Sequence, residues 1–216
     1  MRKMAWLALM LCGCPAFGQW VPLSGTQTST VETLSADGRV TGHRVTKERY
    51  YRASSGSVLV QQMANDGSNV PAAGTLIDYG KTGKTYSLNY RSGAAVDKHR
   101  PARPMRPMTR ADLAPPSEKN GMREETVKGV RCVVAPVYKV NANGTRTLIG
   151  HGWAAPEYNF LMVKQDTVRS LSDGRMVHVV REMENVTAGA EPEPRLFKLD
   201  PDSVKRARII VPPKAK

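Results

Sequence analysis

The fold of this protein is decided by a stretch of alternating strand and turn signals, VRCVVAPVYKVNANGTRTLIGHG (130–152) followed by WAAPEYNFLMVKQDTVRSLSDGRMVHVVREMENV (153–186). Residues 130–134 are rich in β-branched side chains, and the strand pattern resumes after Pro136. A proline has no N–H to donate, which suits an edge strand or a bulge. Asn143-Gly144 tolerates positive φ and is a strong hairpin signal. We therefore expect residues 145–152 to form the partner strand.

The second part of this stretch predicts two further strands. Pro156 biases Ala155 away from helix, and we expect the extended pattern to break at 153–157. We expect the next strand at 159–168, where residues 160–163 are apolar on both faces, as is typical of a central strand. A turn at Asp173-Gly174 then leads into the strand expected at 176–186. Together these segments predict an antiparallel meander. The following segment, EPRLF (193–197), forms either one helical turn beneath the sheet or an ordinary loop.

The order of the motifs ETVKGVRC, GHGWAAPEYNFLMV and SDGRMVHVVREMENVTAGAEPEPRLFKL resembles a group of secreted proteins common in Acidobacteria. More distantly, the chain resembles the half-barrel of the LolA/LolB lipoprotein carriers. The resemblance implies a mainly β fold, with a curved antiparallel sheet or half-barrel and little helix apart from the signal segment. It also implies an envelope compartment. It implies no particular activity, because one fold supports many functions.

The N-terminus has the pattern of an export signal. Arg2 and Lys3 precede a short apolar run at 4–11, which is too short to span a bilayer. The small-x-small sequence before Gln19 predicts a signal peptide at 1–18 and release into the periplasm or the medium. Alternatively, the Leu-Cys-Gly-Cys sequence at 11–14 resembles a lipobox and predicts lipidation of Cys14, with anchoring to the outer membrane.

The remaining chain is of one-domain length and divides by composition. Residues 19–91 form the expected N-terminal β half of the sheet, beginning with a hairpin around Asp37-Gly38. Residues 92–119 contain five prolines among arginines and predict a flexible linker. Residues 120–200 form the C-terminal meander half, and residues 201–216 form a basic tail. We expect eight to eleven strands in total.

The charge and the titratable residues indicate a binding protein and not an enzyme. The net charge is +13, which would suggest nucleic acid in a cytosolic chain. An export signal argues against nucleic acid and favours weak attraction to an anionic membrane surface. The histidines, at positions 43, 99, 151 and 178, show no metal-binding spacing. Cys132 reads as a buried small hydrophobe. We expect no cofactor and no catalytic residue.

The leading hypothesis is binding of a hydrophobic or lipid-like ligand, or of a lipoprotein, on an apolar concave face. Candidate ligand-binding residues are Trp153, Phe160, Met162 and Tyr86. Trp153 either lines the mouth of a cavity or plugs the end of the sheet, since tryptophan mostly buries area. The alternative hypothesis is a periplasmic protein-interaction or sensor module that recruits a partner through its edge strands. The sequence leaves the oligomeric state open.

Overall fold

The computed structural model describes residues 19–66, 68–78, 83–98, 107–112, 116, 121–200 and 202. The signal segment with Cys14, half of the predicted linker and nearly all of the basic tail lie outside these residues. The described strands are β1 (Leu23–Leu34), β2 (Val40–Arg52), β3 (Val58–Met63), β4 (Pro71–Ile77), β5 (Thr85–Asn89), β6 (Ala94–Asp97), β7 (Arg123–Val127), β8 (Val130–Val140), β9 (Arg146–Ala155), β10 (Leu161–Ser170) and β11 (Met176–Ala188). Three short 3-10 turns accompany them: η1 (Arg110–Asp112), η3 (Pro156–Tyr158) and η4 (Pro194–Phe197).

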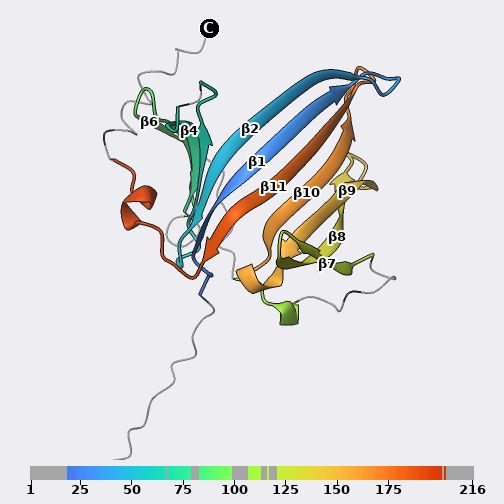
Figure 1. The fold of residues 1–216 in the computed structure, drawn as a ribbon. Coiled ribbons are helices and arrows are strands. Elements are labelled where there is room, and N and C mark those ends of the chain that lie inside the picture. Colours follow the sequence, from blue (N-terminus) through green and yellow to red (C-terminus); the bar gives the residue numbers. More distant parts are fainter. Residues whose placement is uncertain are drawn as a thin grey trace, which may run out of the picture.

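All eleven described strands belong to one antiparallel sheet, in the order β6-β5-β4-β3-β2-β1-β11-β10-β9-β8-β7. Consecutive strands pair as hairpins on each side. The central pair, β1 and β11, comes from opposite ends of the chain and runs from Leu23↔Ala188 to Leu34↔Met176. The sheet curves strongly around its long central strands (Figure 1). The predicted fold class, a mainly β protein with a curved antiparallel sheet and little helix, is confirmed.

Irregular positions in the strand pairing accompany this curvature. The register shifts between Ser24 and Thr26 on β1, between Val137 and Tyr138 on β8, and between Met162 and Lys164 on β10. A bulge bends a strand and increases its local twist, so these positions contribute to the curvature of the sheet.

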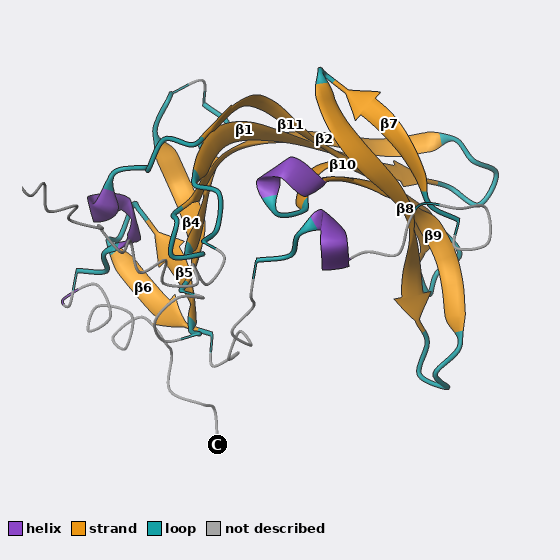
Figure 2. Cartoon of the chain, turned by 90° about the horizontal axis from the view of Figure 1, so that it is seen from below, coloured by secondary structure: helices purple, strands orange, loops and turns teal. Residues whose placement is uncertain are grey.

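The two faces of the sheet carry different elements. The turns η1 and η3 lie inside the curve, on the concave face (Figure 2). The turn η4 lies on the other face, beside β3, in keeping with its place in Figure 1. Buried Leu59 and Leu76 face each other across β3 and β4 on that outer side. The sequence left residues 193–197 open between a helical turn and a loop; the structure has a helical turn there, with Leu196 and Phe197 half-buried.

Strand β9 continues through the residues that were expected to break it. Trp153 lies inside β9, opposite Val134 on β8 and Lys164 on β10, and the strand ends at Ala155. The expected break at Trp153 is therefore wrong. The restriction that Pro156 imposes on Ala155 favours extended backbone, which continues a strand as readily as it ends one.

The proline in β8 occupies a position where no hydrogen bond is needed. The strand β7 pairs with β8 only as far as Val134. Beyond that residue no described strand covers this edge of β8, and Pro136 lies directly past it. The sequence expectation of an edge or a bulge at Pro136 therefore agrees with the structure on both counts, because the register shift follows at Val137.

Two parts of the predicted linker are structured, the turn η1 and a strand near the start of the linker. Residues Ala94–Asp97 form β6 and pair with β5 from Asn89↔Ala94 to Tyr86↔Asp97. The short Ala-Ala-Val run was too brief to stand out against the prolines that follow it. The linker that we predicted from residue 92 therefore begins later, and its other boundaries remain predictions.

Candidate functional site

A mostly apolar hollow lies on the concave face, where the two halves of the sheet meet. It has a volume of about 370 Å³. Its lining comes from β1, β2, β3, β4, β10 and β11 and from the segments beside η1 and η3: Trp20, Gln27, Tyr50, Arg52, Gly56, Val58, Val60, Ile77, Met108, Asn159, Phe160, Leu161, Met162 and Met183. A volume of this size lies within the range of small-molecule pockets, roughly 300–1,000 Å³.

Strand alternation brings the apolar wall of the cavity together. Val58 and Val60 lie two apart on β3, and the register places Val58 opposite both Arg52 and Ile77. Met183 on β11 lies opposite Gln27 on β1. Side chains two apart on a strand share a face. The cavity wall therefore combines the N-terminal and C-terminal halves of the chain.

A buried guanidinium forms one end of the cavity. The Arg52 side chain is only 3% exposed. Its Nε donates to the carbonyl of Val21 at 3.0 Å, and its Nη2 donates to the carbonyl of Tyr158 at 2.7 Å. It also stacks on the Trp20 ring, 5.2 Å from the centroid. Burial lowers the pKa of Arg52, but an arginine stays charged in proteins. This end of the cavity is therefore positively charged.

Asn159 connects three segments at the same end. Its Oδ1 accepts from the Val21 N–H at 2.6 Å, and its Nδ2 donates to the Met108 carbonyl at 3.3 Å. Asn159 and Phe160 both have left-handed backbone, with φ of 49° and 58°. Asparagine tolerates this conformation better than most residues. The left-handed pair ends the η3 turn, and Phe160 lies outside β10, where the sequence had placed it within the strand.

The predicted ligand-binding residues are divided between the two faces of the sheet. Phe160 and Met162 line the cavity. Trp153 and Tyr86 are not part of its lining. Tyr86 lies opposite Leu76 on the outer face. The cavity wall is mostly apolar and includes two of the four candidate residues, and Arg52 and Asn159 were not among the candidates. The alternation of Tyr50 and Arg52 at the end of β2 is the one signal that pointed to the arginine.

Trp153 lies on the convex face, away from the cavity. Its neighbour Gly152 directs the Cβ position toward Met162 on the concave face, so the indole of Trp153 points to the other side. The indole N–H donates to Glu125 Oε2 at 2.7 Å, and Lys164 Nζ lies 5.2 Å from the ring centroid. This bond to Trp153 is the main cause that lowers the pKa of Glu125.

We expect Trp153→Ala to lower the free energy of unfolding by about 2–3 kcal/mol without changing ligand capture. The estimate is below that for a fully buried tryptophan because the indole is half-buried, and it includes the lost hydrogen bond. Urea denaturation and the capture of a fluorescent fatty-acid probe are the measurements. Trp153→Phe, which removes the N–H but keeps a ring, should cost about 1 kcal/mol. If Trp153→Ala lost probe capture while keeping wild-type stability, Trp153 would be a ligand-binding residue and not a structural one.

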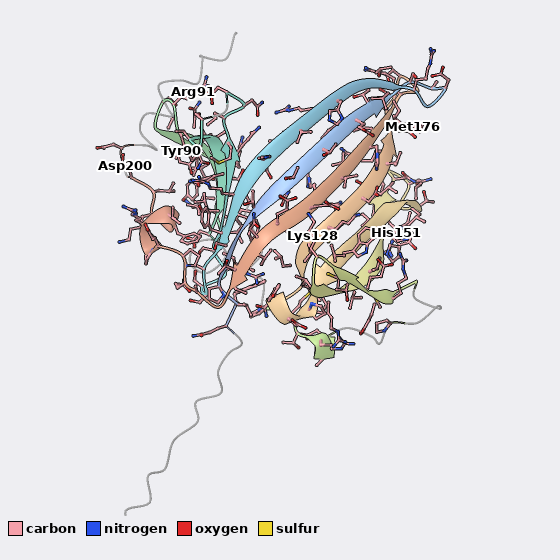
Figure 3. All side chains as sticks on the ribbon, viewed as in Figure 1. Tyr90, Arg91, Lys128, His151, Met176 and Asp200 are labelled. Carbon is pink, nitrogen blue, oxygen red and sulfur yellow. The ribbon has the colours of Figure 1, made fainter. Side chains whose placement is uncertain are left out.

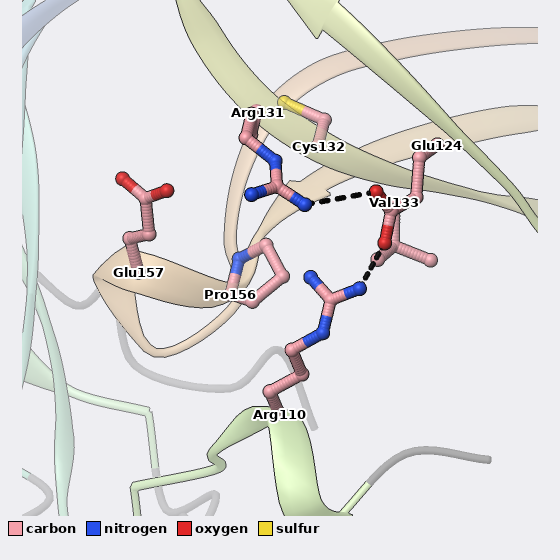
Figure 4. A pocket seen from close by; sticks show the side chains of 7 residues that line it. All are labelled: Arg110, Glu124, Arg131, Cys132, Val133, Pro156 and Glu157. Atoms are coloured by element: carbon pink, nitrogen blue, oxygen red, sulfur yellow. Dashed lines mark hydrogen bonds and ion pairs between the residues drawn. The ribbon is translucent and has the colours of Figure 1, made fainter. Parts of the chain in front are cut away.

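A second, polar pocket of about 250 Å³ lies between η1, η3 and the β7–β8 hairpin. Glu124 accepts from Arg110 and from Arg131, as Figure 4 shows, and these two bonds lower the pKa of Glu124. The predicted burial of Cys132 is confirmed, and burial raises its thiol pKa. This pocket therefore holds a satisfied ion-pair cluster beside an unreactive thiol.

The outer face has a third hollow and a cross-strand histidine. A recess of about 430 Å³ lies between η4 and β3–β6, and its lining includes Tyr90 and Asp200 (Figure 3). On the strands of the other half, His178 lies between Asp166, at 2.9 Å, and Glu32, at 3.4 Å. The Asp166 bond is the main cause that raises the pKa of His178. These contacts join β1, β10 and β11.

Two other searches of the described part of the chain were negative. No group of three or more histidine, cysteine or carboxylate side chains there is arranged to hold a metal ion. No described helix is both long enough and apolar enough to cross a membrane.

Comparison with known proteins gives a distant likeness of fold. No family model matches the chain, and no curated protein matches its sequence. Similar solved structures include a LolA superfamily protein from Nitrosomonas europaea (9% identity, 81% of this chain and 90% of that one, TM-score 0.38) and a DUF1329 family protein from Desulfovibrio piger (11%, 83% and 90%, TM-score 0.35). A domain described as an outer membrane lipoprotein-sorting protein from Vibrio parahaemolyticus is also similar (10%, 80% and 89%, TM-score 0.31). The solved structures to which the chain is distantly similar thus include a LolA superfamily protein, the family that the sequence also resembles.

Proposed function

We propose that this protein is a non-enzymatic envelope protein that binds a hydrophobic or lipid-like ligand, or the acyl chains of a lipoprotein, in the concave cavity. The observation that carries the proposal is the cavity of about 370 Å³, whose wall is mostly apolar. Ligand sites are typically apolar hollows with a few placed polar groups. Arg52, Gln27 and Asn159 are the polar groups among the lining residues.

The predicted export signal supports an envelope location for this function. Cleavage before Gln19 would release the protein into the periplasm or the medium, whereas lipidation of Cys14 would anchor it to the outer membrane. In the periplasm or at the outer membrane, the cavity would lie close to membrane lipids. The positive net charge of +13 favours contact with anionic membrane surfaces.

Filling the cavity is the direct test. We expect Val60→Trp to weaken binding of a neutral apolar fluorescent probe by at least about tenfold, since Val60 is half-buried in the cavity wall and an indole would occupy the ligand's space. A tenfold loss corresponds to about 1.4 kcal/mol of binding free energy. Probe titration of the purified mature protein gives the affinity.

The matched control is Val168→Trp. Val168 lies on β10 opposite His178, on the convex face, and is exposed. This substitution adds the same indole side chain outside the cavity, so we expect the variant to bind the probe with wild-type affinity. If both variants bind the probe with wild-type affinity, the concave cavity is not the binding site.

A protein-interaction or sensor module is the second candidate, and one observation favours it. The edge of β8 beyond Val134 has no described partner strand, and apolar side chains beside it are exposed: Tyr138 by 48%, Val140 by 66% and Leu148 by 53%. An open edge can accept an extra strand from a partner. A protein that captures no apolar probe, yet loses a partner on Val140→Lys, would fit this candidate.

A further inference from the structure

We propose that the ligand of the concave cavity is an anionic amphiphile whose negatively charged headgroup binds Arg181 while its chain occupies the cavity. The inference rests on the proposed function and specifies the class of its ligand. The inference is based on the charged side chains of the concave face, which include several arginines beside the cavity and few carboxylates.

Arg181 lies directly beside the cavity. It is on β11, two residues before Met183, so both side chains project to the concave face. Arg181 lines a small recess of about 90 Å³ together with Gln27, Met162 and Met183. These last three residues also line the main cavity. The recess and the cavity are therefore adjoining parts of one groove, with Arg181 in the recess and a mostly apolar cavity wall whose buried Arg52 is already bonded to two backbone carbonyls.

Two more arginines continue the cationic part of the groove. On β2, Arg44 lies opposite Val31, which in turn lies opposite Val179 on β11. On β10, Arg169 lies opposite Val177. Val177, Val179 and Arg181 alternate along one face of β11, so Arg44 and Arg169 share the face of Arg181. We expected an apolar concave face; beyond the cavity, valines such as Val179 lie between exposed arginines, so the face is not apolar throughout.

The pairing of these arginines leaves positive charge available. Among the described residues, no carboxylate forms an ion pair with Arg44 or Arg169, and the one acidic partner of Arg181 is Glu48. Glu48 is half-buried and accepts from Gln27 Nε2 at 3.3 Å. Burial raises the pKa of Glu48, and Arg181 opposes that effect. Glu182 also lines the recess, but it is paired with Lys128 and Lys164. Three arginines therefore face only one carboxylate without a lysine partner, the partly desolvated Glu48, and this region of the groove attracts anions.

The same arrangement disfavours other ligand classes. A neutral apolar molecule would fill the cavity but leave the adjoining arginines without a partner, and a cationic amphiphile would be repelled. A carboxylate or phosphate head can accept two parallel N–H bonds from a guanidinium. Fatty acids and phospholipids share this feature, so the chemistry that Arg181 recognises is an anionic oxygen headgroup on a long apolar chain.

The test compares three ligands with the same chain: palmitic acid, cetyl phosphate and cetyl alcohol, each displacing a neutral fluorescent probe from the full mature protein. We expect the wild type to bind at least one of the two anions about tenfold more tightly than the alcohol, as one charged hydrogen bond allows. Arg181→Gln should reduce this preference to about twofold and leave the affinity for the alcohol unchanged. Arg181→Lys, which keeps the charge, should retain most of it.

The control variant is Lys47→Gln, which removes one positive charge from the convex face of β2 at an exposed position. It should keep the full preference for the anions. Comparing the affinities of palmitic acid and cetyl phosphate shows whether the protein prefers a carboxylate headgroup, a phosphate headgroup or neither. Inorganic phosphate, added as a competitor, should not displace the probe, and displacement by it would overturn the proposal in favour of a chain-free anion site.

Two further outcomes separate the inference from the proposed function. Equal binding of the acid, the phosphate and the alcohol, or an unchanged preference in Arg181→Gln, overturns the headgroup assignment and leaves the apolar cavity intact. Failure of all three ligands to displace the probe, or a wild type that takes up no probe, overturns both.

Discussion

Replacing Gly150 by alanine is expected to lower the free energy of unfolding by about 3 kcal/mol or more, the largest effect of any single substitution considered. Gly150 has φ of 149°, a conformation that is essentially restricted to glycine and costs other residues roughly 1–3 kcal/mol. In addition, an added Cβ would lie 2.0 Å from the carbonyl oxygen of Asp166 on β10. Because that oxygen belongs to the backbone of a neighbouring strand, relieving the clash requires β9 and β10 to separate.

Gly144→Ala is the matched control. Gly144 also has positive φ, 80°, but nothing lies within 4 Å of its Cβ position. It should therefore show the backbone cost alone, about 1 kcal/mol. Urea denaturation of both variants gives the comparison. Equal losses for the two alanines would mean that β9 and β10 approach each other less closely at Gly150 than the structure shows.

Arg52→Met is expected to lower the free energy of unfolding by about 2–4 kcal/mol. The substitution keeps an unbranched side chain of similar length but removes two hydrogen bonds from a charged donor, each contributing roughly 1.5–3 kcal/mol. It leaves the carbonyls of Val21 and Tyr158 without this donor. Removing a buried charge offsets part of the loss. The N-terminal lead into β1 and the turn η3 should both loosen, because Arg52 contacts each of them.

Arg52→Lys separates charge from geometry. The lysine keeps the positive charge but cannot reproduce a planar guanidinium that donates in two directions while stacking on Trp20. We expect the free energy of unfolding of Arg52→Lys, measured by urea denaturation, to lie between the values for the wild type and for Arg52→Met. Hydrogen exchange should locate the change at residues 20–23 and 156–160. Our account of Arg52 would be contradicted if the methionine variant were as stable as the wild type.

The hairpins were determined by local sequence. At Asn143-Gly144 the asparagine Oδ1 accepts from the Thr145 N–H at 3.1 Å, and Gly144 has the positive φ that the turn requires. The turn at Asp173-Gly174 is built in the same way, since Asp173 Oδ1 accepts from the Arg175 N–H at 3.1 Å. These interactions involve neighbours in the chain. Turn chemistry and alternating apolar residues were therefore enough to predict an antiparallel β chain and most of its strands, whereas the curved half-barrel was implied by the family resemblance.

The orientation of individual side chains was harder to predict. Trp153 and Met162 were both candidates for one cavity, yet they lie on opposite faces of the sheet. In a strand, the face of the sheet to which each side chain points depends on the register, and a shift of one residue moves every side chain to the opposite face. The register shift between Met162 and Lys164 has no marker in the sequence. Because the position of this shift cannot be recognised in the sequence, an apolar run such as 160–163 does not reveal which of its side chains face inward.

The sequence by itself determined a mainly β chain of short-range hairpins, and the tertiary structure alone decided where those hairpins meet. The pairing of β1 with β11 joins the N-terminal and C-terminal halves of the sheet, and the cavity forms at that junction. Its polar contacts span long separations in sequence: Arg52 bonds to Tyr158 and Val21 bonds to Asn159, across 106 and 138 residues respectively. Local propensities carry no information about such contacts, because they depend on the closure of the whole sheet. The cavity, its buried arginine and the row of arginines beside it are consequences of that closure.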